Sequence, residues 1–201
     1  MNNDLTECRA FADVYSDDIV IHSHTLTEHL LRNVLDILRK ERLFGKLKKC
    51  TFAMREIEFC GFLVNGEGIR THPDTVVAIQ AWPRPQSVKD VRSFIGLAGF
   101  YQRFVKNFAD IAHPLTHLFK KTTKWTWGPE QENAFQKLMS ALAEYTRLTH
   151  PEFSQNFVVH IEASASALGA TLSQETRLVD LRMVTCTSRK LNPAERNYPT
   201  H

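Results

Sequence analysis

VYSDDIVIHS, residues 14–23, places two adjacent aspartates, Asp17 and Asp18, between two short apolar segments. Apolar runs at 10–15 and 19–22 predict a tight β-hairpin with the aspartates at its tip. Two carboxylates at such a tip suit Mg²⁺, which prefers oxygen ligands, and paired metals stabilise the attacking and leaving oxygens of phosphoryl transfer. Asp-Asp is also common in ordinary turns. Spacing alone therefore leaves a metal-binding tip and a plain turn as alternatives.

Composition sets broad limits on the protein class. The chain has 201 residues and a mass of 23.1 kDa, enough for one large or two small domains. Its formal net charge of +3 permits a polyanionic partner without requiring one. The four cysteines form no C-x-x-C pair, so we expect reduced thiols and no zinc site. With no signal peptide and no long apolar run, we expect an intracellular protein, cytoplasmic or nuclear, without a membrane partner.

The first third of the chain has the pattern of hairpins and one helix. After the hairpin at 10–22, Thr25 and Glu28 form a capping box that predicts the start of an amphipathic helix. Its apolar stripe continues to about Leu43. Residues 50–70 alternate imperfectly and break at two glycines. We predict a second hairpin there, with its turn near Asn65–Gly68.

The remainder changes to short helices separated by proline, followed by strands. The periodicity predicts helices at 73–82, 88–104, 111–121 and 132–148, a linker at 122–131, and strands at 156–164 and 167–174. The expected fold class is α+β. Three blocks follow: hairpins plus helix over residues 1–70, a helical block over 71–121, and an α/β segment over 122–201.

Basic residues interleaved with aromatics recur in two places. One cluster covers residues 39–50. The helical block contributes Arg92, Arg103, Lys106, Lys120, Lys121 and Lys124, with Phe100 and Tyr101 among them. This pattern suits phosphate neutralisation and contact with bases or sugars. The solvated face of an amphipathic helix has the same pattern and stays as an alternative.

Isolated acids and histidines give weaker signals. Glu162 lies near the end of a predicted strand, where a carboxylate is able to hold a metal, but a lone glutamate is more often a surface residue. We interpret His22, His24 and His29 as surface residues because none pairs with cysteine or an acid at a metal-binding spacing.

Taken in order, these stretches resemble the Pol polyprotein of gypsy-type LTR retrotransposons, in the reverse transcriptase and ribonuclease H region. The Y-x-D-D hairpin of a polymerase palm is similar to VYSDDIVIHS, and the family's primer-gripping hairpin is similar to EFCGFLVNGEGI. The match extends over essentially the whole chain. The other similar stretches are TEHLLRNVLDILRKERLFGKLKKCTF (palm helix), AWPRPQSVKDVRSFIGLAGFYQRFVKNFADIAHPLTHLFKK (thumb), WTWGPEQENAF with FVVHIEASASALGATLSQ (tether and first ribonuclease H strands), and SRKLNPAERNYPTH (later ribonuclease H).

The resemblance implies a partial polymerase palm with its primer-grip hairpin over 1–70, a helical thumb over 71–121, and a tether with a truncated ribonuclease H-like domain over 122–201. It implies metal-dependent nucleotidyl transfer by an RNA-directed DNA polymerase, with Mg²⁺ or Mn²⁺ as cofactor. The metal ligands would be Asp17 and Asp18, with Glu162 as the first ribonuclease H acid. The implied nucleic-acid contacts are Tyr15, Phe59, Gly61, Phe62, Arg92, Arg103 and Lys106. An RNA–DNA hybrid or a DNA duplex would be the partner.

Several departures from the family lead us to expect an inactive fragment. Ser16 stands where the family has an apolar residue, and IEAS replaces the usual T-D-A-S, which makes the acid Glu162 one methylene longer. The resemblance places the first palm aspartate and the fingers before residue 1, and the later ribonuclease H acids after residue 201. A separate piece of the polyprotein would have to supply them. The alternatives are a non-catalytic, nucleic-acid-binding remnant and a degraded open reading frame.

Overall fold

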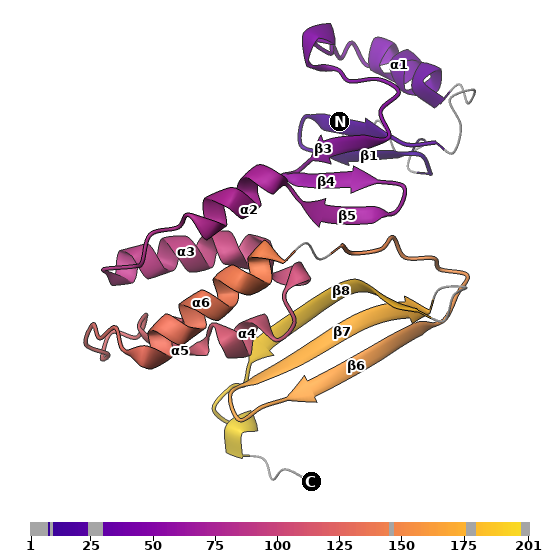
Figure 1. Ribbon diagram of the computed structural model, residues 1–201. Helices are drawn as coiled ribbons and strands as arrows, with labels where there is room; N and C mark the ends of the chain where they lie inside the picture. The colour runs from indigo at the N-terminus through magenta and orange to yellow at the C-terminus, as the bar shows by residue number, and fades with distance from the viewer. Residues whose placement is uncertain (1–7, 9, 24–29, 145–146, 176–179, 198–201) are drawn as a thin grey trace. The chain divides into compact units, whose positions relative to one another are not determined.

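The computed structural model describes residues 8, 10–23, 30–144, 147–175 and 180–197 (Figure 1). The chain forms two compact units, Met1–Asn65 and Gly66–His201. The division into palm, thumb and ribonuclease H-like blocks over 1–70, 71–121 and 122–201 stays a prediction. The predicted capping box at Thr25 and Glu28 lies outside the described residues.

The first unit begins with the predicted hairpin. Strands β1 (Ala12–Tyr15) and β2 (Asp18–Ile21) pair antiparallel, and Tyr15 lies opposite Asp18. Helix α1 (Leu30–Lys40) ends slightly before the predicted end. Its Val34 is buried together with Cys8 and Ala12, and apolar side chains of both strands pack against this cluster. Burial of these side chains holds the helix on one face of the hairpin.

A second hairpin follows, with one turn more than predicted. After the short 3₁₀ helix η2 (Leu47–Lys49), strands β3 (Glu56–Phe59) and β4 (Phe62–Asn65) pair antiparallel. The chain turns again between β4 and β5 (Gly68–Thr71), at the predicted position. The sequence analysis missed the turn at Cys60–Gly61 because cysteine is not a typical turn residue.

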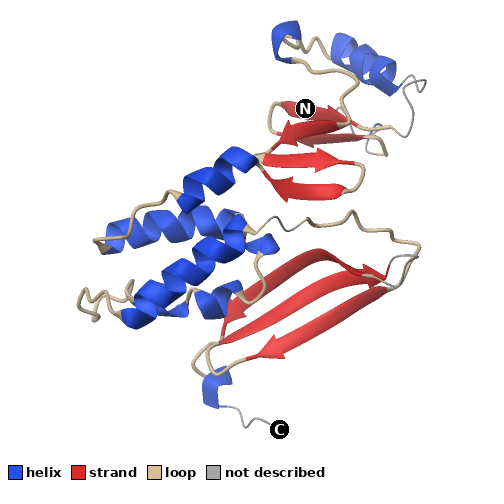
Figure 2. Ribbon diagram, viewed as in Figure 1, coloured by secondary structure: helices blue, strands red, loops and turns tan. Residues whose placement is uncertain are grey.

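The second unit contains a helical bundle, drawn in blue in Figure 2. Helix α2 packs against α6, α5 packs against α3 and α6, and α4 contacts both α5 and α6. Local signals fix several helix starts: the Ser87 hydroxyl accepts from the Asp90 N–H at 3.3 Å, and proline occupies the first turn of three helices. The elements are α2 (Pro73–Gln80), α3 (Val88–Phe100), η3 (Gln102–Phe104), α4 (Phe108–Ile111), α5 (His113–His117) and α6 (Pro129–Ala143).

Each of the predicted helices differs from its predicted bounds; α2 ends at Gln80 rather than residue 82, α3 at Phe100 rather than 104, and α6 at Ala143 rather than 148. The segment predicted as one helix over 111–121 belongs to two short helices, α4 and α5. Helix α6 begins before the predicted residue 132, because the Gln131 side chain accepts from the Gly128 N–H at 3.1 Å and closes the first turn. The linker is accordingly shorter than the predicted 122–131.

The core of the bundle centres on two aromatic rings. Phe94 of α3 and Phe135 of α6 are almost completely buried, and their ring centroids lie 4.7 Å apart in an edge-to-face contact. Such pairs stabilise beyond the burial of their area. The other large, fully buried side chains of this unit are Ile79, Val91, Leu115 and Leu138.

A three-stranded antiparallel sheet completes the second unit, in the order β6-β7-β8. Strands β6 (Phe157–Ala163) and β7 (Ala167–Glu175) match the prediction, whereas β8 (Leu181–Lys190) was not predicted. A one-turn helix, η4 (Glu195–Asn197), follows β8. Helix α4 packs on β7 and β8, and η3 packs on β8, so these two short elements join the bundle to the sheet.

Strand β5 is tied to the segment that follows α6. Ile69 and Leu148 exchange two backbone hydrogen bonds of 2.8 and 2.9 Å. At Gly68 φ is +146°, and a Cβ there would lie 2.0 Å from the Leu148 carbonyl oxygen, so only glycine fits. None of the helices in the described part of the chain is long and apolar enough to cross a membrane.

Replacing Phe135 with alanine should destabilise the second unit by about 3–5 kcal/mol, because a large cavity would open beside Phe94. Urea unfolding followed by tryptophan fluorescence measures this, since all three tryptophans belong to the second unit. Phe153→Ala is the matched control, because that ring is 84% exposed; its cost should stay under about 1 kcal/mol. Equal losses for the two variants would contradict the assignment of the core.

Candidate functional site

The aspartate pair occupies the tip of the first hairpin. Ser16 and Asp17 form the two-residue turn, and Ser16 adopts a left-handed φ of 56°, as the first central residue of the mirror-image hairpin turns does. Asp18 is the first residue of β2, one position earlier than the predicted strand. Tyr15, 66% exposed, lies directly across from it. Both carboxylates are exposed, as a site for an incoming ligand requires.

The tip of the second hairpin lies beside the first. Cys60 and Gly61 both have positive φ, 52° and 77°, which a two-residue type I′ turn needs, and Phe59 pairs with Phe62 at its base. Burial raises the pKa of the Cys60 thiol, and the negative charge of Asp18 raises this pKa further. Cys60 is therefore close enough for the charge of Asp18 to act on its thiol.

The predicted residues of the first unit are therefore brought together. Asp17, Asp18 and Tyr15 share one turn, and the turn that carries Phe59, Gly61 and Phe62 is close enough for the Asp18 charge to act on Cys60. All three residues of the second turn are half-buried. The sequence analysis did not single out Cys60; its positive φ at a two-residue turn is visible only in the structure.

The donor set at this tip fits a hard divalent cation. Mg²⁺ binds proteins through one or two carboxylates and completes its six ligands with water or substrate phosphates. Asp17 and Asp18 supply two such carboxylates. Within the described ranges, no group of three or more His, Cys, Asp or Glu side chains gathers at any point. The tip therefore offers part of a coordination shell.

A second candidate site is a polar pocket of about 200 Å³ between α4 and the turn from β6 to β7. Glu162, the predicted ribonuclease H acid, lines it and accepts a hydrogen bond of 2.5 Å from the Asn107 side-chain amide. Asn107 itself has a left-handed φ of 54°. A Cβ at Gly169 would lie 2.0 Å from the Asn107 Oδ1 atom, so this glycine leaves room for the amide.

The same pocket holds a second acid that the sequence analysis missed. Asp110 accepts hydrogen bonds from the hydroxyls of Ser164, at 2.6 Å, and Ser166, at 2.5 Å. These two bonds, Ser164 first, lower the pKa of the Asp110 carboxyl and keep it ionised. No sequence signal connects Asp110 with Glu162, because they belong to different elements and are 52 positions apart in the sequence.

The three predicted basic contacts occupy two places in the second unit. Arg92, on an exposed position of α3, lies over the Phe119 ring at 5.5 Å. Arg103 lies within η3, and Lys106 follows on the connection from η3 to α4. The Cys186 thiol of β8 donates to the Arg103 carbonyl at 3.0 Å, which fixes this connection on the sheet. The side chains of Arg103 and Lys106 lie on exposed residues.

Comparison with known sequences shows which proteins this chain is similar to. Residues 127–201 match the RNase H-like domain found in reverse transcriptase. Over 92% of this chain, the sequence is 41% identical to the retrovirus-related Pol polyprotein from transposon 297 of Drosophila melanogaster. It is 37% identical, over 94% of the chain, to the Pol polyprotein from transposon gypsy of the same species. The Tf2-3 transposon polyprotein of Schizosaccharomyces pombe is 30% identical over 92%. The chain spans only 17%, 19% and 14% of these relatives' lengths, respectively.

Solved structures show the same fold. A foamy viral protease-reverse transcriptase dRH in complex with double-stranded DNA superposes with a TM-score of 0.82 at 25% identity, over 98% of this chain and 35% of that chain. A foamy viral protease-reverse transcriptase in complex with an RNA/DNA hybrid gives 0.79 at 25% identity, over 98% and 27%. The predicted α+β fold class is confirmed.

Changing Asp18 to asparagine should lower the pKa of the Cys60 thiol, because the neighbouring negative charge that disfavours the thiolate disappears. Burial remains, so the fall is partial. The rate of Cys60 alkylation against pH, resolved by peptide mass spectrometry, measures this pKa. Asp13→Asn, on β1 beside His22, is the matched control and should leave the profile in place. An unchanged profile for the Asp18 variant would show that the Asp18 charge does not act on Cys60, and would contradict the proximity of the two hairpin tips.

Proposed function

We propose, since the chain belongs to the Pol polyproteins of gypsy-type LTR retrotransposons, that it is the duplex-holding part of a reverse transcriptase. In this proposal its first unit carries two metal-binding aspartates of an RNA-directed DNA polymerase. The observation that carries the proposal is the meeting of the two hairpin tips. One presents Asp17 and Asp18, and the other presents the residues expected to grip a primer end.

Nucleic-acid duplex is the partner that suits the basic residues. The foamy viral structures with this fold were determined with double-stranded DNA and with an RNA/DNA hybrid. Arg103 in η3 and Lys106 just after it are exposed, and the Arg103 carbonyl accepts from the Cys186 thiol of β8, so both charges stand on a segment that is fixed to the sheet. We propose that they contact backbone phosphates, which position a protein on duplex without reading its sequence. We propose the same role for Arg92.

Asp17 and Asp18 would hold Mg²⁺ or Mn²⁺. The metal, when bound, would supply charge stabilisation to the oxygens that exchange at phosphorus. The chain's own residues have simpler tasks in this proposal. The two carboxylates fix the cation at the hairpin tip, and Tyr15, opposite Asp18, lies beside the primer end and the incoming nucleotide. Phe59, Gly61 and Phe62 form the neighbouring wall that orients the primer.

Glu162 is proposed as the remnant of a ribonuclease H acid. Its carboxylate is one methylene longer than the aspartate that the family resemblance predicts, and the Asn107 amide already binds it at 2.5 Å. A cation would have to compete with this hydrogen bond. We therefore propose that ribonuclease H cleavage by the 201-residue chain is absent.

Primer extension by the purified 201-residue chain, with Mg²⁺ or Mn²⁺, should stay at background. Two carboxylates leave most of the six ligand positions of each metal to other groups, so the incoming nucleotide would lack a complete site. The assay follows a labelled primer annealed to RNA or DNA template. Robust extension that Asp17→Asn abolishes would overturn the proposed inactivity and would confirm the metal site. Extension that survives this substitution would point to a contaminating polymerase.

The second candidate function is a non-catalytic module that binds nucleic-acid duplex, which the exposed side chains of Arg103 and Lys106 favour. We expect duplex binding to survive in the 201-residue chain. Arg103→Ala with Lys106→Ala should weaken binding to an RNA–DNA hybrid and make it less salt-dependent. Each lost phosphate contact reduces the slope of log K against log salt by about 0.9, so a fall of about 2 is expected. Fluorescence anisotropy across a salt series measures this slope.

The matched control removes the same charge elsewhere in the second unit. Lys137→Gln on α6 with Arg182→Gln at the start of β8 changes two exposed basic residues. This double variant should retain the wild-type slope. If both double variants lose affinity equally, binding depends on net charge alone and the assigned contacts are wrong.

A further inference from the structure

Basic side chains from three elements of the second unit converge at the end of β8. The rings of His113 and His117 on α5 lie 6.2 Å apart, one helical turn from each other. The Lys190 ammonium, at the last position of β8, donates a hydrogen bond to the Thr116 hydroxyl between them. Together with three neighbouring basic residues, the two histidines form what we call the basic cluster: His113, His117, Lys120, Lys190 and Arg196.

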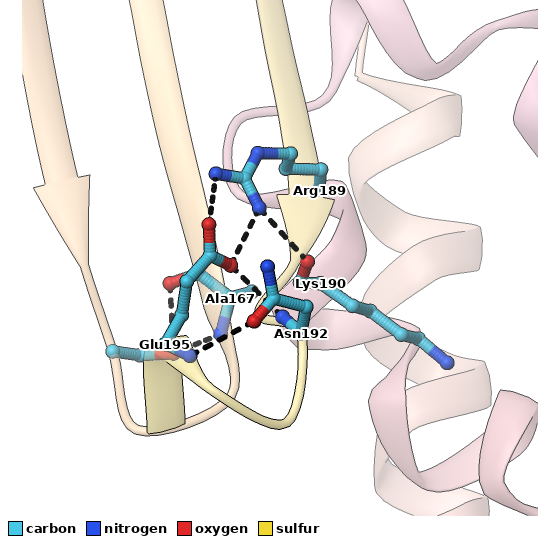
Figure 3. A network of polar contacts seen from close by, with 6 residues as sticks. Ala167, Arg189, Lys190, Asn192 and Glu195 are labelled. Carbon is cyan, nitrogen blue, oxygen red and sulfur yellow. Dashed lines mark hydrogen bonds and ion pairs between the residues drawn. The ribbon is translucent and has the colours of Figure 1, made fainter. Parts of the chain in front are cut away.

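A polar network holds the chain reversal that places Lys190 and Arg196 (Figure 3). The Arg189 guanidinium donates two hydrogen bonds of 2.8 Å to the Glu195 carboxylate. Glu195 also accepts from the Asn192 N–H, and the Asn192 side chain accepts in return from the Glu195 N–H, both at 2.8 Å. In Figure 3 the Lys190 side chain extends away from this network, toward the helices.

The nearby acids are committed elsewhere. Glu195 is bound to Arg189, which lowers the pKa of its carboxyl to about 2. Asp110, the acid whose charge reaches His113, accepts hydrogen bonds from two serine hydroxyls. In the described part of the chain, the charges that act on Lys190 are therefore those of Lys120 and Arg196, with no carboxylate among them.

The charges of the cluster act on the pKa values of two of its members, Lys190 and His113. Partial burial lowers the pKa of Lys190, and the charges of Lys120 and Arg196 lower this pKa further. Burial likewise lowers the pKa of His113, followed by the charges of Lys190, Arg196 and His117, against a small opposite effect of Asp110. An anion at this place would relieve the repulsion, because it favours the charged form of each group.

We propose that the basic cluster is a phosphate-binding site that holds a backbone phosphate of nucleic-acid duplex. Lysine and arginine are the side chains that bind phosphate most effectively, and imidazole nitrogens add donors at short range. The three permanent cations repel a metal ion, so the two histidines are not metal ligands. The nucleic-acid source rests on the proposed function, whereas the phosphate chemistry rests on the cluster itself.

The site adds to the contacts proposed above. Arg103 and Lys106 lie before α4, whereas the basic cluster joins α5 to the end of β8 and to η4. Duplex that engages both would cross the side of the second unit where the helices meet the sheet. Of these five residues only Lys120 belongs to the basic pattern seen in the sequence, and the cluster itself could not be predicted because its members are up to 83 positions apart.

The first test compares two charge-matched double variants of the full chain. Lys190→Gln with Arg196→Gln should weaken binding to a short RNA–DNA hybrid roughly tenfold and reduce the salt slope by about 1, because one phosphate contact is lost. The control, Lys137→Gln with Arg182→Gln, should match wild type; Arg182 lies on the same strand, near its other end. Circular dichroism melts of both variants verify folding. Equal affinity and equal slope for the two folded variants would overturn the proposal.

The second test identifies the source of the phosphate and does not depend on duplex binding. Imidazole carbon–proton NMR spectra, assigned with His113→Gln, give the pKa of His113 in buffer, in inorganic phosphate and with the hybrid. The proposal expects the hybrid to raise this pKa, and the Lys190/Arg196 variant to abolish the rise. If only inorganic phosphate raises it while the hybrid binds elsewhere, the site serves free phosphate and the nucleic-acid assignment is overturned. If the chain binds no hybrid, the proposed function fails, and a rise in inorganic phosphate still supports the phosphate site.

Discussion

The packing of residues 107–110 across the second unit's sheet is the constraint on which both of its candidate sites depend. Glu162, Gly169 and Ser188 form one cross-strand row through β6, β7 and β8. The Asn107 amide donates to Glu162 and fits against Gly169. The Ala109 N–H donates to the Ser188 hydroxyl at 2.8 Å. A larger residue than glycine in the middle of the row would displace the asparagine.

The packing of residues 107–110 on the sheet has opposite effects at its two sides. On the side of β6 the Asn107 amide is hydrogen-bonded to the Glu162 carboxylate that a metal would use. On the side of β8 the packing fixes the start of α5, so that His113 and His117 face Lys190. One packing arrangement thus satisfies an acid and gathers cations whose nearby acids, among the described residues, are bound elsewhere. An acid already hydrogen-bonded is a poor metal ligand, whereas uncompensated cations favour an anion.

The first unit follows a different rule, because two sharp turns bring its functional residues together. Each turn has only two residues, and three of these four residues have positive φ. Short loops of this kind fix the register of both hairpins, and the register sets which side chains stand at each tip. The pKa of the Cys60 thiol then connects the tips, since it responds to the charge of Asp18. Predicted residues separated by about forty positions become neighbours in this way.

Much of the fold could be predicted where the signal was local. The hairpin around Asp17, the cap at Ser87 and the strands beside Gly169 follow from alternation, capping and turn residues within short windows. The turn at Cys60 was missed because its residue type does not indicate one, and α6 started early because a side chain three positions away completes its first turn. Strand β8 was missed because polar and apolar residues are mixed along it. Its partner β7, and the helix α4 that covers it, supply the pairing and the burial that stabilise it.

By itself, the sequence determined the resemblance to retrotransposon Pol polyproteins, the α+β class and the presence of paired acids at a hairpin tip, because ordered motifs and local periodicity carry that information within single elements. Only the tertiary structure decided that the Asn107 amide is hydrogen-bonded to Glu162, that Asp110 lines the same pocket, and that His113 lies near Lys190. These pairs join elements separated by long stretches of chain. Their proximity arises from the packing of α4 and α5 against the sheet, and from the Arg189–Glu195 contact that fixes the chain reversal after β8.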